Sequence, residues 1–177
     1  MKRIWAPWRL EYVRQPVKKG CFLCRILKES DDRANLLVKR GELVSVVLNR
    51  YPYNNGHVMV FPNRHVPDIK SLTPEEKFAM MAVVDETIEV LLRALRPDGF
   101  NIGANLGRVA GAGLVGHLHF HVVPRWNGDT NFMPVVSETK VVSQSLLELW
   151  EQLSPVFASQ GRKCGGSRRK QRKTRRK

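Results

Sequence analysis

Two short apolar runs and one long periodic segment predict most of the secondary structure of this chain. Residues 43–48 and 57–61 are largely apolar, and the turn-forming residues between them predict a buried antiparallel hairpin. Thr73-Pro74-Glu75-Glu76 has the composition of a helix N-terminus with a capping box. Apolar residues then recur at helical spacing until residues 97–99, and we expect Met80 and Met81 among them to fill the core. The recurring positions are Phe78, Met81, Ile88, Leu91, Leu92 and Leu95.

Shorter patterns complete the expected fold. Residues 100–105 and 117–123 read as two further strands, and residues 143–153 as a second helix. On that helix we expect an inner face formed by Leu146, Leu147 and Trp150. Strands that pair locally around an intervening helix predict an α+β fold, with a mainly antiparallel sheet, one long helix and a C-terminal helix. We assign residues 1–157 to one folded domain and residues 158–177 to a disordered basic tail.

The net charge of +14 is concentrated at the end of the chain. Residues 162–177 contain ten Lys or Arg and no acid, and without them 20 basic and 16 acidic residues leave a net charge of +4. A segment of this composition cannot bury enough apolar surface to fold alone. Two interpretations stay open: a solvated extension, or electrostatic contact with nucleic acid.

Neither a membrane-spanning run nor a secretory signal is evident, so we expect a cytoplasmic protein without membrane contact. Three cysteines fit a reducing compartment better than a disulfide framework. Cys21 and Cys24 form a Cys-x-x-Cys pair, which alone is compatible with a redox pair, half of a zinc site or two buried thiols. The Trp-rich segment 3–14 is expected to dock onto the domain or onto a partner subunit.

The chemistry is expected in residues 111–125. His117, His119 and His121 alternate with apolar residues, and in a strand alternate side chains share one face. We therefore expect three imidazoles on one surface. Glycines just upstream can bring backbone N–H groups close to an anion. They are Gly107, Gly111, Gly113 and Gly116. Imidazoles beside an anion-binding loop indicate nucleophilic or acid–base chemistry on phosphate.

The pattern His-x-His-x-His-Val-Val-Pro resembles the histidine-triad superfamily of nucleotide hydrolases and transferases. The resemblance extends over about residues 5–155, and several shorter segments follow in the order found in that family. Those segments are Leu48-Asn49-Arg50, Gly56-His57-Val58, Pro62-Asn63-Arg64-His65, Asn105-Leu106-Gly107 and residues 125–132. The last two are similar to the bacterial branch that includes diadenosine-tetraphosphate phosphorylases.

This resemblance implies catalytic roles. His119 matches the nucleophile that forms a nucleotidyl-imidazole intermediate, and a neutral imidazole needs no deprotonation to attack. His121 and His57 would contact the same phosphate or the leaving group. Residues that would bind the substrate are Asn49, Asn105, Gly111, Gly113, Leu114 and Trp126.

The resemblance also implies a structural zinc ion, no organic cofactor, and a homodimer. Zinc takes four ligands of Cys and His type, and the matching positions are Cys21, Cys24, His65 and His117. The long helix and segment 3–14 are expected to form the dimer interface.

One departure from the pattern of the family bears on which molecule accepts the nucleotidyl group from the histidine. Hydrolases of the fragile-histidine-triad branch carry a side-chain amide where this chain has Gly113. The departure favours phosphorolysis of diadenosine tetraphosphate, with inorganic phosphate as acceptor, over hydrolysis by water. Three alternatives stay open: a dinucleoside polyphosphate hydrolase, a nucleotide-binding module tethered to nucleic acid by its tail, and an enzyme that repairs DNA ends.

Overall fold

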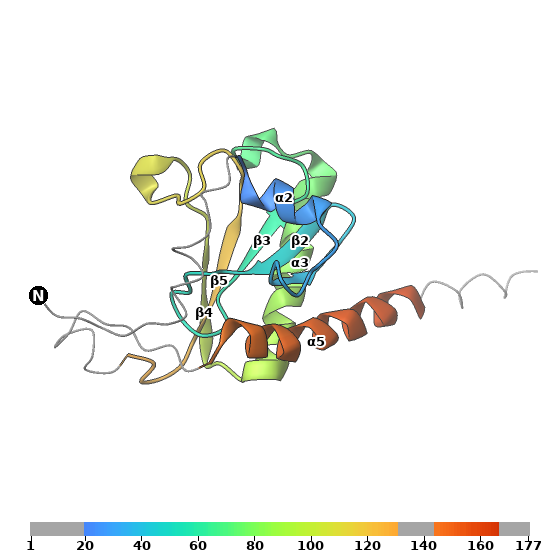
Figure 1. Cartoon of the computed structure of the whole chain (residues 1–177), viewed down its shortest axis with the longest axis vertical. Helices are drawn as coiled ribbons and strands as arrows, with labels where there is room; N and C mark the ends of the chain where they lie inside the picture. Colours follow the sequence, from blue (N-terminus) through green and yellow to red (C-terminus); the bar gives the residue numbers. More distant parts are fainter. Residues whose placement is uncertain (1–19, 131–143, 167–177) are drawn as a thin grey trace, which may run out of the picture.

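The computed structural model describes residues 20–130 and 144–166 (Figure 1). The Trp-rich segment 3–14 and residues 167–177 of the basic tail therefore lie outside the described residues. Within the described part no helix is long and apolar enough to cross a membrane.

A five-stranded antiparallel sheet forms the centre of the described molecule, with the strand order β1-β2-β3-β5-β4. Its strands are β1 (Leu37–Lys39), β2 (Val44–Leu48), β3 (Val58–Pro62), β4 (Gly99–Gly103) and β5 (Phe120–Arg125). Every residue of β2 and β3 is buried, because both faces of this hairpin are covered. The structure confirms the predicted hairpin and the α+β fold, while the three-residue strand β1 was not predicted.

The long helix α3 (Pro74–Leu95) begins at the predicted capping box. The Glu76 N–H donates to Thr73 Oγ1 at 3.2 Å, and the Thr73 N–H donates to the Glu76 carboxylate at 2.8 Å. The helix packs behind the sheet with Met80, Val84 and Leu91 in the core (Figure 1).

The predicted core positions at the start of α3 are partly wrong. The side chains of Phe78 and Met81 are 78% and 59% exposed, whereas Met80 is buried. The apolar residues of this helix form more than one stripe, and the sheet covers the stripe that contains Met80 and Val84. Helical periodicity alone does not tell which stripe the sheet will cover.

Two further helices flank the sheet. Helix α2 (Phe22–Lys28) was not predicted; it contributes Leu23 and Ile26 to the core. Helix α5 (Leu146–Gly166) packs against α3 and β1 and extends well past the predicted end at residue 153 and the domain boundary at residue 157. Trp150 lies on the inner side, where its Nε1–H donates to the Leu37 carbonyl at 2.8 Å. Leu147 is 46% exposed, so its predicted inward position is wrong; the stripe that packs inward contains Leu149, Leu153 and Phe157.

Strand β5 begins three residues later than predicted. The Leu118 N–H donates to the carbonyl of Val66, outside the sheet, at 2.7 Å, so the ladder with β3 starts only at Phe120. Pro124 lies near Leu91 and Leu95 of α3 around Gly56. Because side chains alternate along a strand, His121 faces the opposite side of the sheet from α3.

Candidate active site and metal cluster

Three histidines form an imidazole cluster at the start of β5: His57, His119 and His121. The ring centroids of His119 and His121 are 4.9 Å apart, and those of His57 and His121 are 5.1 Å apart. His57 and His119 are buried, and His121 is partly buried. The structure thus brings together the three residues expected to be catalytic.

The hydrogen bonds of His119 leave one ring nitrogen available. His119 Nδ1 lies 2.9 Å from the backbone carbonyl of His117. A carbonyl only accepts hydrogen bonds, so Nδ1 carries a proton, and Nε2 is the nitrogen that can offer a lone pair. A neutral imidazole in this tautomer presents a nucleophilic nitrogen.

His57 and His121 are joined to each other by a hydrogen bond between their rings. The Tyr53 N–H donates to His57 Nδ1 at 3.0 Å, so the neutral His57 ring carries its proton on Nε2. His57 Nε2 lies 2.9 Å from His121 Nδ1 and donates to it. His121 Nδ1 therefore accepts, and His121 Nε2 carries the proton.

The environment of His121 keeps this ring neutral at physiological pH. Burial lowers the pKa of His121 to about 4, with a smaller contribution from the neighbouring His119. Tyr53, which the sequence interpretation missed, also stacks on His57 with ring centroids 4.8 Å apart. Its main contribution is a backbone N–H, which any residue other than proline provides, so no sequence signal marks it.

The glycine-rich loop between β4 and β5 contains the 3-10 turn η2 (Arg108–Ala110). Gly107 and Gly111 flank this turn with φ values of 83° and 84°, which side chains with a Cβ rarely adopt. Asn105 braces the loop, since its Nδ2 lies 3.4 Å from the Gly111 carbonyl. Leu114 packs partly against the core, while Gly113 has open space where a Cβ would point.

Asn49 and Trp126 occupy different surroundings. Asn49 Oδ1 accepts the Tyr51 N–H at 2.9 Å, which is a turn contact, and its Nδ2 lies 3.4 Å from His57 Nε2. Asn49 therefore borders the imidazole cluster. The indole N–H of Trp126 donates to the Arg96 carbonyl at the end of α3, so this side chain is held at the helix terminus.

A pocket of about 200 Å³ is lined in part by Tyr53, whose ring stacks on His57 of the imidazole cluster. On β5, Val123 follows His121 on the same face of the sheet, and Asn101 pairs with Val123 from β4. The Arg125 guanidinium at the pocket donates two hydrogen bonds to Asp129, so its charge is paired. The pocket is lined by Tyr53, Asn54, Asn101, Val123 and Arg125.

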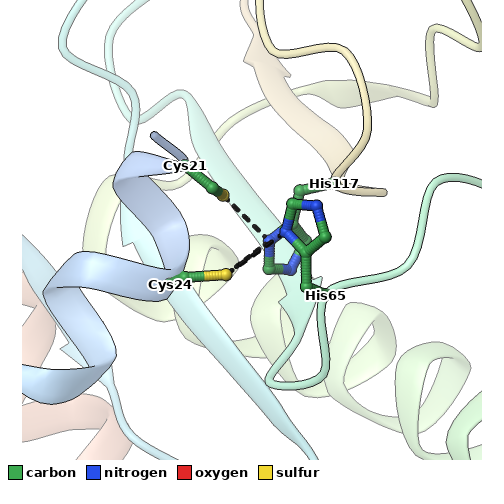
Figure 2. Close-up of side chains that lie close together, drawn as sticks. All are labelled: Cys21, Cys24, His65 and His117. Atoms are coloured by element: carbon green, nitrogen blue, oxygen red, sulfur yellow. Dashed lines mark hydrogen bonds between the residues drawn. The ribbon is translucent and has the colours of Figure 1, made fainter. Parts of the chain in front are cut away.

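A second cluster, here the Cys2His2 cluster, consists of Cys21, Cys24, His65 and His117 (Figure 2). Both cysteines project from the start of α2 toward the two imidazoles (Figure 2). Cys21 Sγ lies 3.1 Å and Cys24 Sγ 3.5 Å from His117 Nδ1, and Cys24 Sγ lies 3.3 Å from His65 Nδ1.

These four residues fit a zinc ion. Their ligand atoms all lie within 4.8 Å of one another, and a tetrahedral zinc site separates its ligand atoms by about 3.4–3.8 Å. His117 Nε2 donates to the Pro62 carbonyl at 2.8 Å, which leaves Nδ1 free to bind a metal. Burial lowers the pKa of His117 and favours the neutral ring that a metal requires.

The alternation alone predicted that all three histidines of the motif share one surface. The structure shows instead that the side chain of His117 lies apart from those of His119 and His121. The chain makes an extra contact to Val66 before β5 begins, and the His117 side chain turns to the cysteines. The Cys-x-x-Cys pair lies with two histidines, which favours the zinc half-site among its three interpretations.

Comparison with known proteins shows the family. Residues 31–128 match the HIT domain model. The chain belongs to the HIT domain family, that is, the histidine-triad proteins. It is 40% identical over 168 residues to the AP-4-A phosphorylase of Mycobacterium tuberculosis, covering 90% of this chain and 86% of that protein.

Two other relatives bear on the chemistry. The asymmetrical bis(5'-nucleosyl)-tetraphosphatase of Schizosaccharomyces pombe is 30% identical over 130 residues, covering 73% of this chain and 68% of that protein. The crystal structure of a Zn-bound histidine triad family protein from Mycobacterium smegmatis is similar with a TM-score of 0.62 and 29% identity. That likeness covers 81% of this chain and 97% of the other.

Proposed function

We propose that this protein is an enzyme that cleaves dinucleoside polyphosphates, diadenosine tetraphosphate above all, by phosphorolysis. The observation that carries the proposal is the hydrogen bond from His119 Nδ1 to the His117 carbonyl, because it places a proton on Nδ1 and makes Nε2 the nitrogen of this buried residue that can attack. The 40% identity to an AP-4-A phosphorylase supports the substrate class.

In the first step His119 Nε2 attacks an α-phosphorus. A nitrogen–phosphorus bond forms, and the bond from phosphorus to the bridging oxygen breaks. ATP leaves with the electron pair, while His121 Nε2–H donates a hydrogen bond to the departing oxygen. His57, held by Tyr53, keeps His121 in the donating tautomer.

In the second step inorganic phosphate takes the place of the departed nucleotide. One of its oxygens attacks the adenylyl phosphorus, the bond to His119 breaks, and ADP is released. Backbone N–H groups of residues 107–114 stabilise the charge of the transition state. Asn49, Asn105, Gly111, Gly113, Leu114 and Trp126 are proposed to contact the substrate.

The pocket beside His121 supports a substrate with two nucleosides. A leaving group in line with His119 extends past His121, and Val123 is the next residue of β5 on that face. Because Asp129 neutralises Arg125, the pocket suits an uncharged, hydrogen-bonding ring better than another phosphate. The second nucleoside of the substrate has that chemistry.

Product analysis distinguishes phosphorolysis from hydrolysis. With inorganic phosphate present, diadenosine tetraphosphate is expected to give ADP and ATP; without phosphate, AMP is expected to form slowly. Mass spectrometry of the products is the measurement. Rapid AMP formation that ignores added phosphate would make the protein a hydrolase, like its relative from S. pombe.

We also propose that the Cys2His2 cluster binds one structural zinc ion. Zinc there would join α2 to the segment after β3 and to the chain entering β5, which adds folding free energy. The ligand separations, the hydrogen bond from His117 to Pro62 and the Zn-bound relative support it.

Two partner proposals and a location follow from the surface and the sequence. The exposed Phe78 and Met81 of α3 and Ile102 of the edge strand β4 support a homodimer through these elements. The basic residues from 162 onward support a salt-sensitive contact with nucleic acid. A cytoplasmic location stays a prediction from the apolar pattern of the sequence and from its cysteine usage.

A further inference from the structure

The segment Pro62–Val66 is anchored at every residue except the proposed metal ligand. Asn63 Nδ2 donates to the carbonyls of Gly41 and Glu42 at 2.8 and 3.0 Å. Asn63 Oδ1 accepts from the buried Ser45 hydroxyl at 2.7 Å. These bonds fix the start of the segment to the β1–β2 turn.

The next residue, Arg64, is held to the N-terminus of α3 by its own side chain. Its Nε and Nη2 donate to the two carboxylate oxygens of Glu76 at 2.9 and 2.6 Å, and Nη2 also donates to the Ser71 carbonyl at 2.7 Å. The Glu76 side chain is only 7% exposed. The hydrogen bonds from Arg64 lower the pKa of Glu76 to about 2, so the carboxylate stays charged.

His65, in contrast, has little to hold its side chain. His65 is exposed, and it lies between the end of β3 and the 3-10 turn that begins at Ile69, where the backbone forms neither helix nor strand. Among the described residues, its only hydrogen bond joins Nδ1 to Cys24 Sγ. The other proposed histidine ligand, His117, is buried and has its second nitrogen fixed by Pro62.

We propose that the Arg64–Glu76 ion pair positions His65 as a metal ligand. The inference rests on the proposed zinc site. Among the described residues the His65 ring has one hydrogen bond, to Cys24, and a T-shaped contact with the ring of His117, with centroids 5.0 Å apart. Because neither contact comes from outside the cluster, the place of His65 near Cys24 depends on the backbone on either side. Val66 is held by Leu118, and Arg64 is held by Glu76. Loss of the ion pair frees one side of His65 and weakens metal binding.

The test separates metal positioning from helix capping, because Glu76 serves in both. Glu76→Gln keeps an amide oxygen at the capping position but removes the charge that holds Arg64. Glu75→Gln makes the same chemical change on the neighbouring exposed residue and is the matched control. Arg64→Gln removes the other partner and leaves the capping box intact.

Two measurements are made on the full chain. Titration with Co²⁺ alone, followed by its visible absorption, reports affinity and tetrahedral geometry. Release of Zn²⁺ from loaded protein to a chromogenic chelator reports the dissociation rate and does not require a folded metal-free form. We expect Glu76→Gln and Arg64→Gln to lose about 10-fold in affinity and to release zinc faster by a similar factor. Glu75→Gln is expected to match the unmodified protein.

Equal metal affinity and release in Glu76→Gln, Arg64→Gln and unmodified protein would overturn the inference and reduce Glu76 to a helix cap. A melting temperature that falls equally with and without metal, with affinity unchanged, would overturn it in the same way. Unmodified protein that binds no metal would overturn the zinc site itself, and this inference with it.

Discussion

His117 and His119 lie two residues apart, yet they are held in opposite tautomers. His117 has Nε2 tied to the Pro62 carbonyl and directs Nδ1 at two thiols. His119 has Nδ1 tied to the His117 carbonyl, and none of the hydrogen bonds among the described residues involves its Nε2. The same side chain thus suits metal binding in one place and nucleophilic attack in the other.

The comparison shows that a backbone carbonyl selects the tautomer of each of these two imidazoles. The two roles are also connected, since the carbonyl that fixes His119 belongs to His117. A metal on His117 would fix the backbone from which the nucleophile takes its orientation. Damage to the imidazole cluster should abolish chemistry, whereas damage to the Cys2His2 cluster should act first on stability.

The largest expected effect is a loss of turnover when the imidazole cluster is changed. His119→Asn is expected to lower kcat on diadenosine tetraphosphate by at least about 10⁴-fold, because an amide cannot form the nucleotidyl intermediate. The melting temperature and zinc content should stay unchanged. His121→Asn is the comparison variant, with a smaller loss of about 10²–10³-fold. Near-normal turnover of pure His119→Asn protein would remove the nucleophile from the mechanism.

A change in the other cluster should have the reverse profile. Cys24→Ala is expected to remove zinc, which metal analysis should find at one ion per unmodified chain, and to lower the melting temperature by about 10 °C or more. Turnover at low temperature should fall far less than in His119→Asn. Cys164→Ala, outside the Cys-x-x-Cys motif, serves as control. Unmodified protein purified without chelator and free of zinc would exclude the site.

The pH dependence of stability should report the buried neutral His121. Its pKa falls from about 6.5 in the unfolded chain to about 4 in the folded protein. Between these two pKa values the unfolded chain binds more protons than the folded protein. The free energy of unfolding is therefore highest above pH 6.5, and it falls as the pH falls toward 4. Denaturant titrations from pH 7.5 to 5 should show a loss of about 1–2 kcal/mol that His121→Asn lacks. Identical slopes in both proteins would contradict a buried neutral ring.

The smallest expected effect concerns the acceptor. Gly113→Gln is expected to raise the ratio of AMP to ADP a few-fold, because an amide at this position can orient water near the adenylyl group. The open space at Gly113 allows the side chain without loss of folding. Gly113→Ala, which adds no hydrogen-bonding group, is the control. An unchanged product ratio would show that this position does not select the acceptor.

Several features could be predicted from the sequence because they are local. The capping box at Thr73 and Glu76 and the hairpin of β2 and β3 depend on residues close in the chain, and the structure confirms both. The residues of the two clusters were identified through motifs. Burial on α3 could not be predicted in full, because periodicity does not say which apolar stripe the sheet covers, as Phe78 shows.

The features of the site that could not be predicted from the sequence are contacts between residues far apart in the chain, or contacts made by the backbone. The hydrogen bond from His117 to the Pro62 carbonyl spans 55 residues, and the Tyr53 N–H that orients His57 has no residue-type signature. Arg64 belongs to a motif that the sequence analysis identified. Its pairing with Glu76 could not be predicted, because it depends on where α3 packs in the folded protein. Strand β1 has three residues, too few for a periodic pattern.

The central claim is that a nucleotide is transferred to His119. Diadenosine tetraphosphate is mixed with the protein without phosphate, quenched within milliseconds in alkali, digested, and analysed by peptide mass spectrometry. We predict one adenylate on the peptide that contains His119, lost within one turnover when phosphate is added and absent in His119→Asn. Adenylate on His121 alone, or turnover with no adenylated peptide at any time, would contradict the account.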